Sequence, residues 1–375
     1  MNPNPLQRLY RAGQSIWLDY IDRAMLHDGR LTRMIEQDAL VGMTSNPSIF
    51  EKALAEGHAY DAQIASAADL NPAELFEFIE TDDVRTACDR FAEVFDTTEG
   101  QDGYVSIEVS PSQAFDADAT VVEARRLWNT VARPNVMVKV PGTPEGARAI
   151  RQLIAEGINV NVTLLFAIEA HDRVIEAYQA GLEDRLATGQ PIDRVASVAS
   201  FFVSRVDTEV DKRLNAMAAG ASGAERDRLL ALRGRAAIAN ARLAYRLFSQ
   251  RFAGTRWEHL ATRGAMVQRP LWASTSTKNP EYRDVVYVEQ LIGPHTVNTL
   301  PPATMNAFRD HGVVERTVDR GIEQAEADIA ALEAAGIPLA DVTQQLLTEG
   351  VASFQRSFDT LLAGLSRKTA SLVAS

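Results

Sequence analysis

One lysine lies in an apolar stretch where a charged side chain is unexpected. The segment VMVKVPG (136–142) places Lys139 between Val138 and Val140, and a proline and a glycine follow. Burial disfavours the ammonium form of a lysine, and the neutral amine is the form that attacks carbonyl carbons. The protonated imine that results is an electron sink, so a neighbouring carbon–carbon bond can break or form. Lys139 is therefore a candidate nucleophile.

Two carboxyl groups are candidates for the proton transfers that this chemistry requires. Imine formation must expel water, and bond cleavage must take a proton from a hydroxyl, so both steps need a positioned acid or base. Asp19 closes SIWLD (15–19), and Glu108 lies within YVSIEVSP (104–111). A structural alternative stays open for each: Lys139 and Glu108 could form a buried ion pair without chemistry, and Asp19 could cap a following helix.

Polar residues recur with a period of two in these apolar stretches. In INVNVT (158–163) three polar residues alternate with aliphatic ones, and YVSIEVSP repeats the pattern. Successive side chains of a strand point to opposite faces, so the aliphatic set suits the helix side of a barrel and the polar set its interior. The polar groups stand late in their strands, where such barrels have their active sites. We expect one cavity to gather Asp19, Asn46, Glu108, Lys139, Asn161, Thr163 and Ser200. Three of these groups, Asn46, Asn161 and Ser200, are expected to hold substrate hydroxyls, although turns and strand ends use the same residue types.

Eight strands are expected to position these groups. They are residues 15–20, 40–47, 104–111, 136–142, 158–166, 195–203, 270–277 and 295–301. Helical patterns separate them, for example Asp118–Val131 and Gly146–Glu156. Alternation of strands and helices predicts parallel pairing, and eight such units predict an α/β fold of the (β/α)₈ TIM barrel type.

Additional helices are expected within a single domain that spans 1–375. They occupy about 50–100, 206–262 and 311–375, and the second of these segments is interrupted near GASGAE (220–225). The third contains two apolar stripes that are expected to pack on the barrel. The stripes are Val314, Val318, Ile322, Ala325, Ile329 and Leu332, then Leu346, Leu347, Val351, Phe354, Phe358, Leu361 and Leu365.

Composition excludes several classes of function. The chain of 375 residues carries a formal net charge of −12, which disfavours general binding to nucleic acid. Any anionic substrate therefore requires a local cationic pocket, although the chain has only five lysines. A single cysteine, Cys88, excludes an internal disulfide. The beginning of the chain lacks the apolar segment of a secretory signal, and no run of about 18 apolar residues is present. We expect a soluble, cytoplasmic protein without membrane contact, either monomer or homodimer.

No cofactor is expected either. The six histidines show no ligand spacing typical of a metal site. Neither G-x-G-x-x-G nor G-x-x-x-x-G-K-[ST] occurs, so dinucleotide and P-loop sites lack support.

Several stretches together resemble the transaldolase family, in its longer bacterial form. They are GMTSNPSIF (42–50), SIEVSP (106–111), VMVKVPGTPEG (136–146), INVNVTLLF (158–166), VASFFVSRVDTEVDKRL (198–214) and VTQQLLTEGVASFQRSFDTLL (342–362). The resemblance spans nearly the whole chain, and the order and spacing of the motifs make it specific.

The resemblance implies a fold, a reaction and a set of roles. Transaldolases are barrels of the class I aldolase kind, in which a strand lysine, here Lys139, forms the imine. Asp19 matches the catalytic aspartate, and Glu108 with Thr163 matches the pair that manages water. The substrate-binding positions match Asn46, Asn161 and Ser200. The family moves a dihydroxyacetone unit between sugar phosphates in the non-oxidative pentose phosphate pathway, without a metal or organic cofactor.

The phosphate end of the site departs from the family pattern. The family arginine beyond the sixth strand matches Arg205. A second basic group after the seventh strand is usually arginine in the shorter enzymes, but ASTSTKNP offers Lys278, with Ser274 nearby. Lysine binds phosphate as a point charge and lacks the bidentate fork of arginine. Both cations could instead be solvated surface charges.

Two other functions are compatible with the same residues. A fructose 6-phosphate aldolase-like lyase would use the same lysine but release free dihydroxyacetone. A barrel that binds sugar phosphates without catalysis would need no reactive amine.

Overall fold

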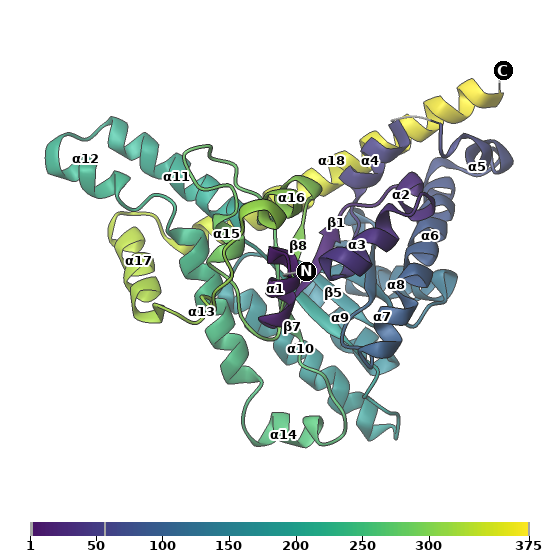
Figure 1. Ribbon diagram of the computed structural model, residues 1–375, viewed down its shortest axis with the longest axis horizontal. Helices are drawn as coiled ribbons and strands as arrows, with labels where there is room; N and C mark the ends of the chain where they lie inside the picture. The colour runs from purple at the N-terminus through teal and green to yellow at the C-terminus, as the bar shows by residue number, and fades with distance from the viewer. Residues whose placement is uncertain (1–2, 56–57, 374–375) are drawn as a thin grey trace.

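The computed structural model describes residues 3–55 and 58–373, and a closed barrel of eight parallel strands in chain order forms its centre (Figure 1). The strands are β1 (Gln14–Asp19), β2 (Leu40–Thr44), β3 (Tyr104–Glu108), β4 (Val136–Pro141), β5 (Val160–Leu165), β6 (Ser197–Phe202), β7 (Arg269–Ala273) and β8 (Thr296–Leu300). The predicted (β/α)₈ barrel is confirmed, and each of the eight strands overlaps its predicted segment.

Helices surround the barrel. Those before β3 are α1 (Pro5–Arg11), α2 (Arg23–His27), α3 (Arg30–Asp38), α4 (Pro47–Ala55), α5 (Asp61–Ser66), α6 (Pro72–Arg90) and α7 (Ala92–Thr97). Between β3 and β7 lie the 3₁₀ turn η1 (Pro111–Gln113), α8 (Ala117–Val131), α9 (Pro144–Glu156), α10 (Ile168–Ala187), α11 (Ser204–Ala219), α12 (Gly223–Leu230), α13 (Ala236–Arg251) and α14 (Thr255–Ala261). The last are α15 (Val286–Glu289), α16 (Pro302–His311), α17 (Ile322–Ala334) and α18 (Leu339–Val373). Within the described residues, no helix is both long and apolar enough to cross a membrane.

Parallel register brings the functional side chains of neighbouring strands to one level. Glu108 on β3 pairs with Lys139 on β4, and Lys139 pairs with Asn161 on β5. The aliphatic residues that alternate with them, such as Val138 and Val160, are fully buried on the helix side. The period-two pattern therefore places the polar set inside the barrel and the aliphatic set outside it.

Large and charged side chains fill the barrel toward the N-terminal ends of its strands. Trp17 is fully buried, and Gly42 on the next strand makes room for it, because a Cβ at Gly42 would lie 2.5 Å from the indole Nε1. Farther toward the N-terminal ends, Arg269 donates to Ser15 Oγ at 2.8 Å and to Asp102 Oδ1 at 3.0 Å. The interior of the barrel is therefore filled toward this end, and the functional side chains late in the strands lie at the opposite, C-terminal end.

All eight predicted strands end earlier than expected, three of them by three or more residues. Residues 45–47, 109–111 and 274–277 leave the sheet because turn structures begin there. The Asn46 side chain accepts from Ile49 N at 3.1 Å at the start of α4, and Pro111 opens η1. Ser274 adopts a left-handed backbone with φ of 55°. These turns direct the loops across the mouth of the barrel.

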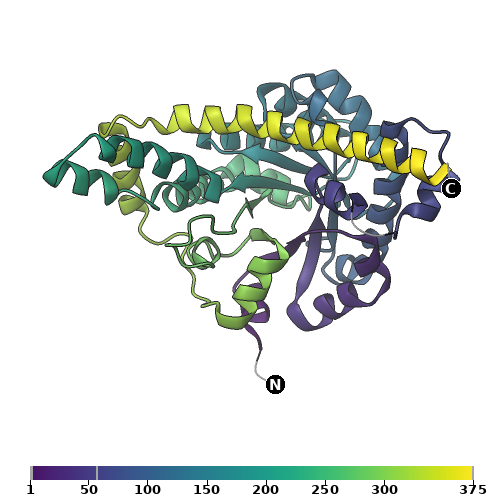
Figure 2. The same cartoon turned by 90° about the horizontal axis from the view of Figure 1, so that it is seen from above.

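The longest helix, α18, crosses the whole molecule (Figure 2). It packs against α4, α5 and α6 at one end and against α11 at the other, with contacts to β5 between them. Its buried residues include Leu346, Phe354, Leu361 and Leu365, as the second apolar stripe predicts. The first stripe is only partly helical. The helix begins at Ile322, not Val314, because Thr317 and Val318 donate their backbone N–H groups to Ile292 O before the chain turns at Gly321.

One buried histidine lies in the helix layer. His171 on α10 is fully buried, and neither ring nitrogen has a hydrogen-bond partner among the described residues. Its ring packs beside Phe201 with centroids 5.8 Å apart. Burial lowers the pKa of His171 from 6.5 to about 4. The imidazole is therefore neutral in the folded protein and acts as core packing.

We predict that His171 makes the fold acid-sensitive. Between pH 6.5 and about 4 the unfolded chain binds a proton at this residue and the folded chain does not, so stability present above pH 6.5 is lost as pH falls, by up to about 3 kcal/mol. His171→Leu should flatten this part of the urea-unfolding free energy against pH, whereas exposed His259→Gln should not. An unchanged slope in His171→Leu would contradict the assignment.

Candidate active site

A cavity of about 660 Å³ opens at the C-terminal mouth of the barrel. Sequence-predicted residues that line it are Asp19, Asn46, Lys139, Thr163, Ser200, Arg205, Ser274 and Lys278. Two further predicted residues, Glu108 and Asn161, lie beside Lys139 through the strand register. The strand ends thus bring the polar set together around one space.

Lys139 is held from two sides. Its side chain is 8% exposed, and Nζ donates to Ser45 O at 2.9 Å and lies 3.4 Å from Glu108 Oε2. The carbonyl comes from the turn after β2 and the carboxyl from β3. The amine therefore points into the mouth of the barrel with a proton acceptor beside it.

Two carboxyl groups lie near the lysine, the half-buried Asp19 and the buried Glu108. Burial raises the pKa of Asp19, against the opposing charge of Lys139 and a hydrogen bond of 2.9 Å from Thr44 Oγ1. Burial also raises the pKa of Glu108, again opposed by Lys139. A carboxyl whose pKa is moved toward neutrality can both accept and donate a proton near pH 7.

The helix-capping alternative for Asp19 does not apply. The cap of α2 is Asp22, whose side chain accepts from Met25 N at 2.7 Å. The hydroxyl of Thr44, which binds Asp19, also lies 2.8 Å from Thr299 Oγ1. Asp19 is thus linked across β2 to β8 and points into the cavity rather than toward a helix.

Asn161 and Ser200 form a chain of hydrogen bonds within the barrel. Ser200 Oγ donates to Asn161 Oδ1 at 2.6 Å, and Asn161 Nδ2 donates to Ser106 Oγ at 2.9 Å. This chain fixes the amide orientation of Asn161. Of the two residues, Ser200 lines the cavity.

Thr163 differs from its neighbours because its buried hydroxyl has no hydrogen-bond partner in the described part of the chain. The backbone kinks next to it, since Leu164 has φ of 59° and the pairing with β6 shifts there. A buried hydroxyl that faces a cavity without a partner is a natural ligand for a bound water or substrate. Asn46, in contrast, lines the cavity while its side-chain oxygen accepts from Ile49 N at the start of α4.

A cationic rim lies on the β6 and β7 side of the cavity. Arg205 sits over the Phe202 ring at 5.2 Å and makes no ion pair with the residues that the structure describes. Burial lowers the pKa of Arg205, but a guanidinium stays charged at neutral pH. Lys278 is exposed, and its Nζ donates to Ser276 Oγ at 2.6 Å. Partial desolvation at the cavity and the charge of Arg205 lower its pKa. An anion would satisfy both cations.

Ser274 is placed beside this rim by its own turn. Its hydroxyl lies 3.1 Å from that of Ser204, and Ser204 N donates to Ser274 O at 3.0 Å. These bonds join the loop after β7 to the start of α11. They hold the hydroxyl next to Arg205, the following residue of α11.

Several lining residues were not predicted from the sequence. They are Tyr20, Thr44, Ser48, Ile49, Lys52, Phe202, Ser276, Thr299 and Phe354, among others. The sequence could have predicted an inward-facing Thr44, because Gly42 and Thr44 alternate with the apolar Val41 and Met43. No strand pattern predicts Lys52 and Phe354, since they reach the cavity from helices α4 and α18.

The mouth of the barrel is covered by α18. Phe354 lines the cavity, and Ser357 accepts a hydrogen bond of 2.8 Å from Ser48 on α4. Gly350 allows the helix to approach β5, because a Cβ there would lie 3.0 Å from Leu164 Cδ2. The helix therefore limits the access of water to the amine.

No group of three or more His, Cys, Asp or Glu side chains in residues 3–55 and 58–373 is placed to hold a metal ion. The site contains the amine of Lys139, two carboxyl groups with raised pKa values, the unpaired hydroxyl of Thr163 and the cationic rim. Such a set suits a carbonyl compound that carries an anionic group at its other end.

Comparisons with known proteins agree with this chemistry. The family model described as transaldolase/fructose-6-phosphate aldolase matches residues 16–365. The transaldolase of Thermobifida fusca is 47% identical over 370 residues, which cover 98% of this chain and 99% of that protein. The transaldolase of Mycobacterium leprae is 47% identical over 365 residues, 96% of this chain and 95% of its own. Transaldolase 1 of Streptomyces coelicolor is 47% identical over 365 residues, 96% of this chain and 94% of its own.

The cationic rim predicts binding of inorganic phosphate in the cavity. Arg205→Ala should weaken that binding about tenfold or more, because it removes charge-assisted hydrogen bonds. Lys278→Ala should cost less, since the lysine is exposed. Lys212→Ala, about two turns further along α11 and outside the lining of the cavity, should cost nothing. Isothermal titration calorimetry at fixed salt measures each affinity. Equal affinity in Arg205→Ala and Lys212→Ala would refute the role of the rim.

Proposed function

The chain belongs to the transaldolase/fructose-6-phosphate aldolase family, and from this premise we propose that it is a transaldolase that works through an imine on Lys139. It converts sedoheptulose 7-phosphate and glyceraldehyde 3-phosphate into erythrose 4-phosphate and fructose 6-phosphate, a step of the non-oxidative pentose phosphate pathway. One observation carries the proposal for the site: the Lys139 amine is buried in the mouth of the barrel, 3.4 Å from Glu108.

The first stage forms the imine. Transfer of one proton from Lys139 to Glu108 leaves a neutral amine and a neutral carboxyl group. The amine attacks C2 of the ketose, and its proton passes to the C2 oxygen. Glu108 then donates its proton to that hydroxyl, which leaves as water while the nitrogen lone pair forms the C=N bond. The products are an iminium ion and the Glu108 carboxylate, so the total charge is unchanged.

The second stage breaks and reforms a carbon–carbon bond. The Asp19 carboxylate takes the proton of the C4 hydroxyl, the C3–C4 bond breaks, and its electron pair moves toward the iminium nitrogen. The aldose phosphate leaves, and a neutral enamine of dihydroxyacetone stays on Lys139. An acceptor aldehyde then reacts with the enamine carbon, and Asp19 returns its proton to the new hydroxyl.

Release of the product ketose requires water. Glu108 takes a proton from the water that attacks the iminium carbon, and the unpaired hydroxyl of Thr163 is available to orient that water. Asn46 and Ser200 line the cavity where the sugar hydroxyls would lie, with Asn161 held beside them. The cationic rim of Arg205 and Lys278, with Ser274, binds the phosphate group.

Reductive trapping tests the imine. Borohydride added with fructose 6-phosphate should fix a mass increase on the peptide that contains Lys139, because the iminium ion is reduced to a stable amine. Lys139→Met should abolish both the adduct and the activity. The other two lysines that line the cavity, Lys52 and Lys278, lie in other peptides and serve as internal controls. Activity in the Lys139→Met variant would contradict every mechanism that depends on this lysine. Full substrate binding without an adduct would instead support a barrel that binds sugar phosphates without catalysis.

The family description also covers fructose 6-phosphate aldolase, a lyase that would use the same lysine. The dependence on an acceptor aldehyde separates the two reactions. A transaldolase consumes fructose 6-phosphate rapidly only when erythrose 4-phosphate is supplied. Release of free dihydroxyacetone at the rate of transfer would favour the lyase.

Asp19→Ala tests the acid–base assignment. It should lower kcat on the order of 10² to 10⁴, because no group then takes the hydroxyl proton, while the imine can still be trapped. Asp22→Ala is the matched control, since it removes a nearby carboxyl that caps α2 and does not line the cavity. Steady-state kinetics and trapping on both variants give the comparison. A normal kcat in Asp19→Ala would overturn the assignment.

A further inference from the structure

Glu108 lines a second cavity, different from the one that Lys139 lines. This second cavity has a volume of about 590 Å³ and lies between α6 and α8, with Phe358 of α18 at its edge. Among its lining residues are Glu77, Glu80, Thr81, Arg85, Glu108, Ser110, Glu123, Arg126 and Thr130. A cavity of this size that several polar side chains line can hold several water molecules. Glu108 therefore lies between the amine on one side and a polar space on the other.

A second buried carboxylic acid faces this space. Glu80 on α6 is 4% exposed, lines the cavity, and makes no hydrogen bond or ion pair with the described residues. Burial raises the pKa of Glu80 well above its ordinary value, and the charge of Glu108 raises it further. Glu123 and Glu77 act in the same direction, and Lys139 opposes them. An ionised Glu108 thus favours the protonated form of Glu80.

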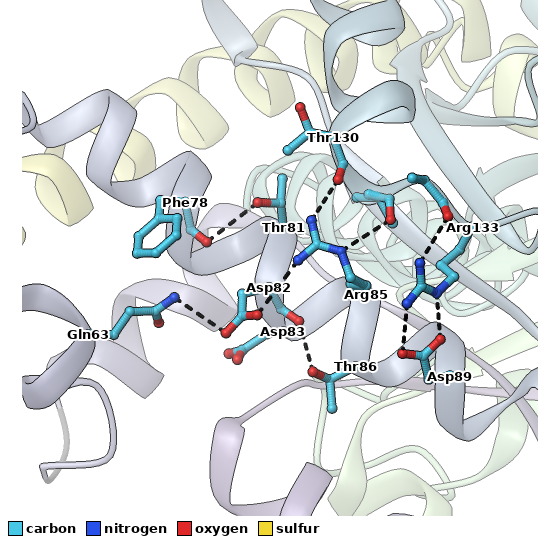
Figure 3. A network of polar contacts seen from close by, with 12 residues as sticks. Gln63, Phe78, Thr81, Asp82, Asp83, Arg85, Thr86, Asp89, Thr130 and Arg133 are labelled. Atoms are coloured by element: carbon cyan, nitrogen blue, oxygen red, sulfur yellow. Dashed lines mark hydrogen bonds and ion pairs between the residues drawn. The ribbon is translucent and has the colours of Figure 1, made fainter. Parts of the chain in front are cut away.

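The walls around Glu80 are fixed by other polar groups of α6 and α8. Arg85 donates to the carbonyl of Thr130 at 2.6 Å and to that of Val131 at 3.3 Å, which joins α6 to the end of α8 (Figure 3). Thr81 is satisfied by the carbonyl of Glu77 at 2.6 Å. Arg126 pairs with Glu77 at 2.7 Å. The neighbours of Glu80 thus have partners of their own, and its carboxyl is left facing the cavity.

We propose that Glu80 and this second cavity supply protons and water to Glu108 from the side away from the sugar. The inference rests on the proposed function, since it concerns the water that imine formation releases and imine hydrolysis consumes. Glu80 is a positioning residue that acts through Glu108, because it does not line the cavity that receives the substrate.

The proton balance of this route is simple. When Glu108 has given its proton to the leaving water, a water of the second cavity passes the proton of Glu80 to the Glu108 carboxylate. Glu80 then recovers a proton from solvent through the same cavity. During hydrolysis the transfers run in the opposite direction. The route moves protons and water only, and no bond to carbon forms or breaks there.

Exchange of the C2 oxygen tests this route separately from carbon–carbon bond chemistry. Fructose 6-phosphate exchanges its C2 oxygen with H₂¹⁸O each time the imine forms and hydrolyses, and mass spectrometry measures the rate against an enzyme-free blank. We expect Glu80→Gln to slow this exchange about tenfold, with unchanged KM and unchanged borohydride trapping after long incubation. Glu77→Gln, the matched loss of a carboxyl at the same cavity, should stay within about twofold of wild type.

The pH profile and chemical rescue exclude a merely structural effect. Wild-type exchange should decline at alkaline pH as Glu80 loses its proton, and Glu80→Gln should lack that decline. Glu80→Ala should be slow, and formate should restore its rate at least about threefold, because a small carboxylic acid can enter the space that the side chain leaves. Wild-type exchange in Glu80→Gln, or absence of rescue by formate, would overturn the proposal. Absence of any adduct on wild-type Lys139 would instead overturn the proposed function.

Discussion

The pairing of the Lys139 amine with the Glu108 carboxyl, inside a barrel closed at its other end, is the interaction on which the site depends. At the observed 3.4 Å, the attraction of two unit charges is about 5 kcal/mol for an effective dielectric constant of about 20. Burial costs each ion several kcal/mol. The two terms are of similar size, so burial balances much of the attraction between the two charges.

The surrounding structure maintains this balance. The parallel register of β3 and β4 sets the two residues opposite each other, and the Ser45 carbonyl holds the amine. Trp17 with Gly42, and the Arg269 network below them, close the lower barrel. On the open side, α18 covers the mouth, and the cationic rim makes one region of a chain with net charge −12 attractive to anions. Three of the five lysines, Lys52, Lys139 and Lys278, line the cavity at the mouth of the barrel.

The alternation of strands with helices was sufficient to predict the barrel. The alternation of polar and apolar residues along each strand was sufficient to predict which strand side chains point inward. Lys139, Glu108 and Asn161 lie at one level because parallel pairing keeps their phase. The limits of the strands were less predictable, since the turn at Ser274 depends on a left-handed backbone that the alternation does not encode. Residues such as Lys52, Phe354 and Glu80 come from helices outside the strand pattern. Their positions follow from how those helices pack, and the spacing of residues within one helix does not determine that.

Nitrogen NMR of the lysine side chains tests the central claim most directly. Protein labelled with ¹⁵N at the lysine side chain contains five ζ-nitrogens. Addition of fructose 6-phosphate should move one of them from the amine to the imine region of the spectrum, and Lys139→Met should remove that signal. A spectrum in which all five nitrogens stay amines under turnover, or in which another lysine becomes the imine, would contradict the account.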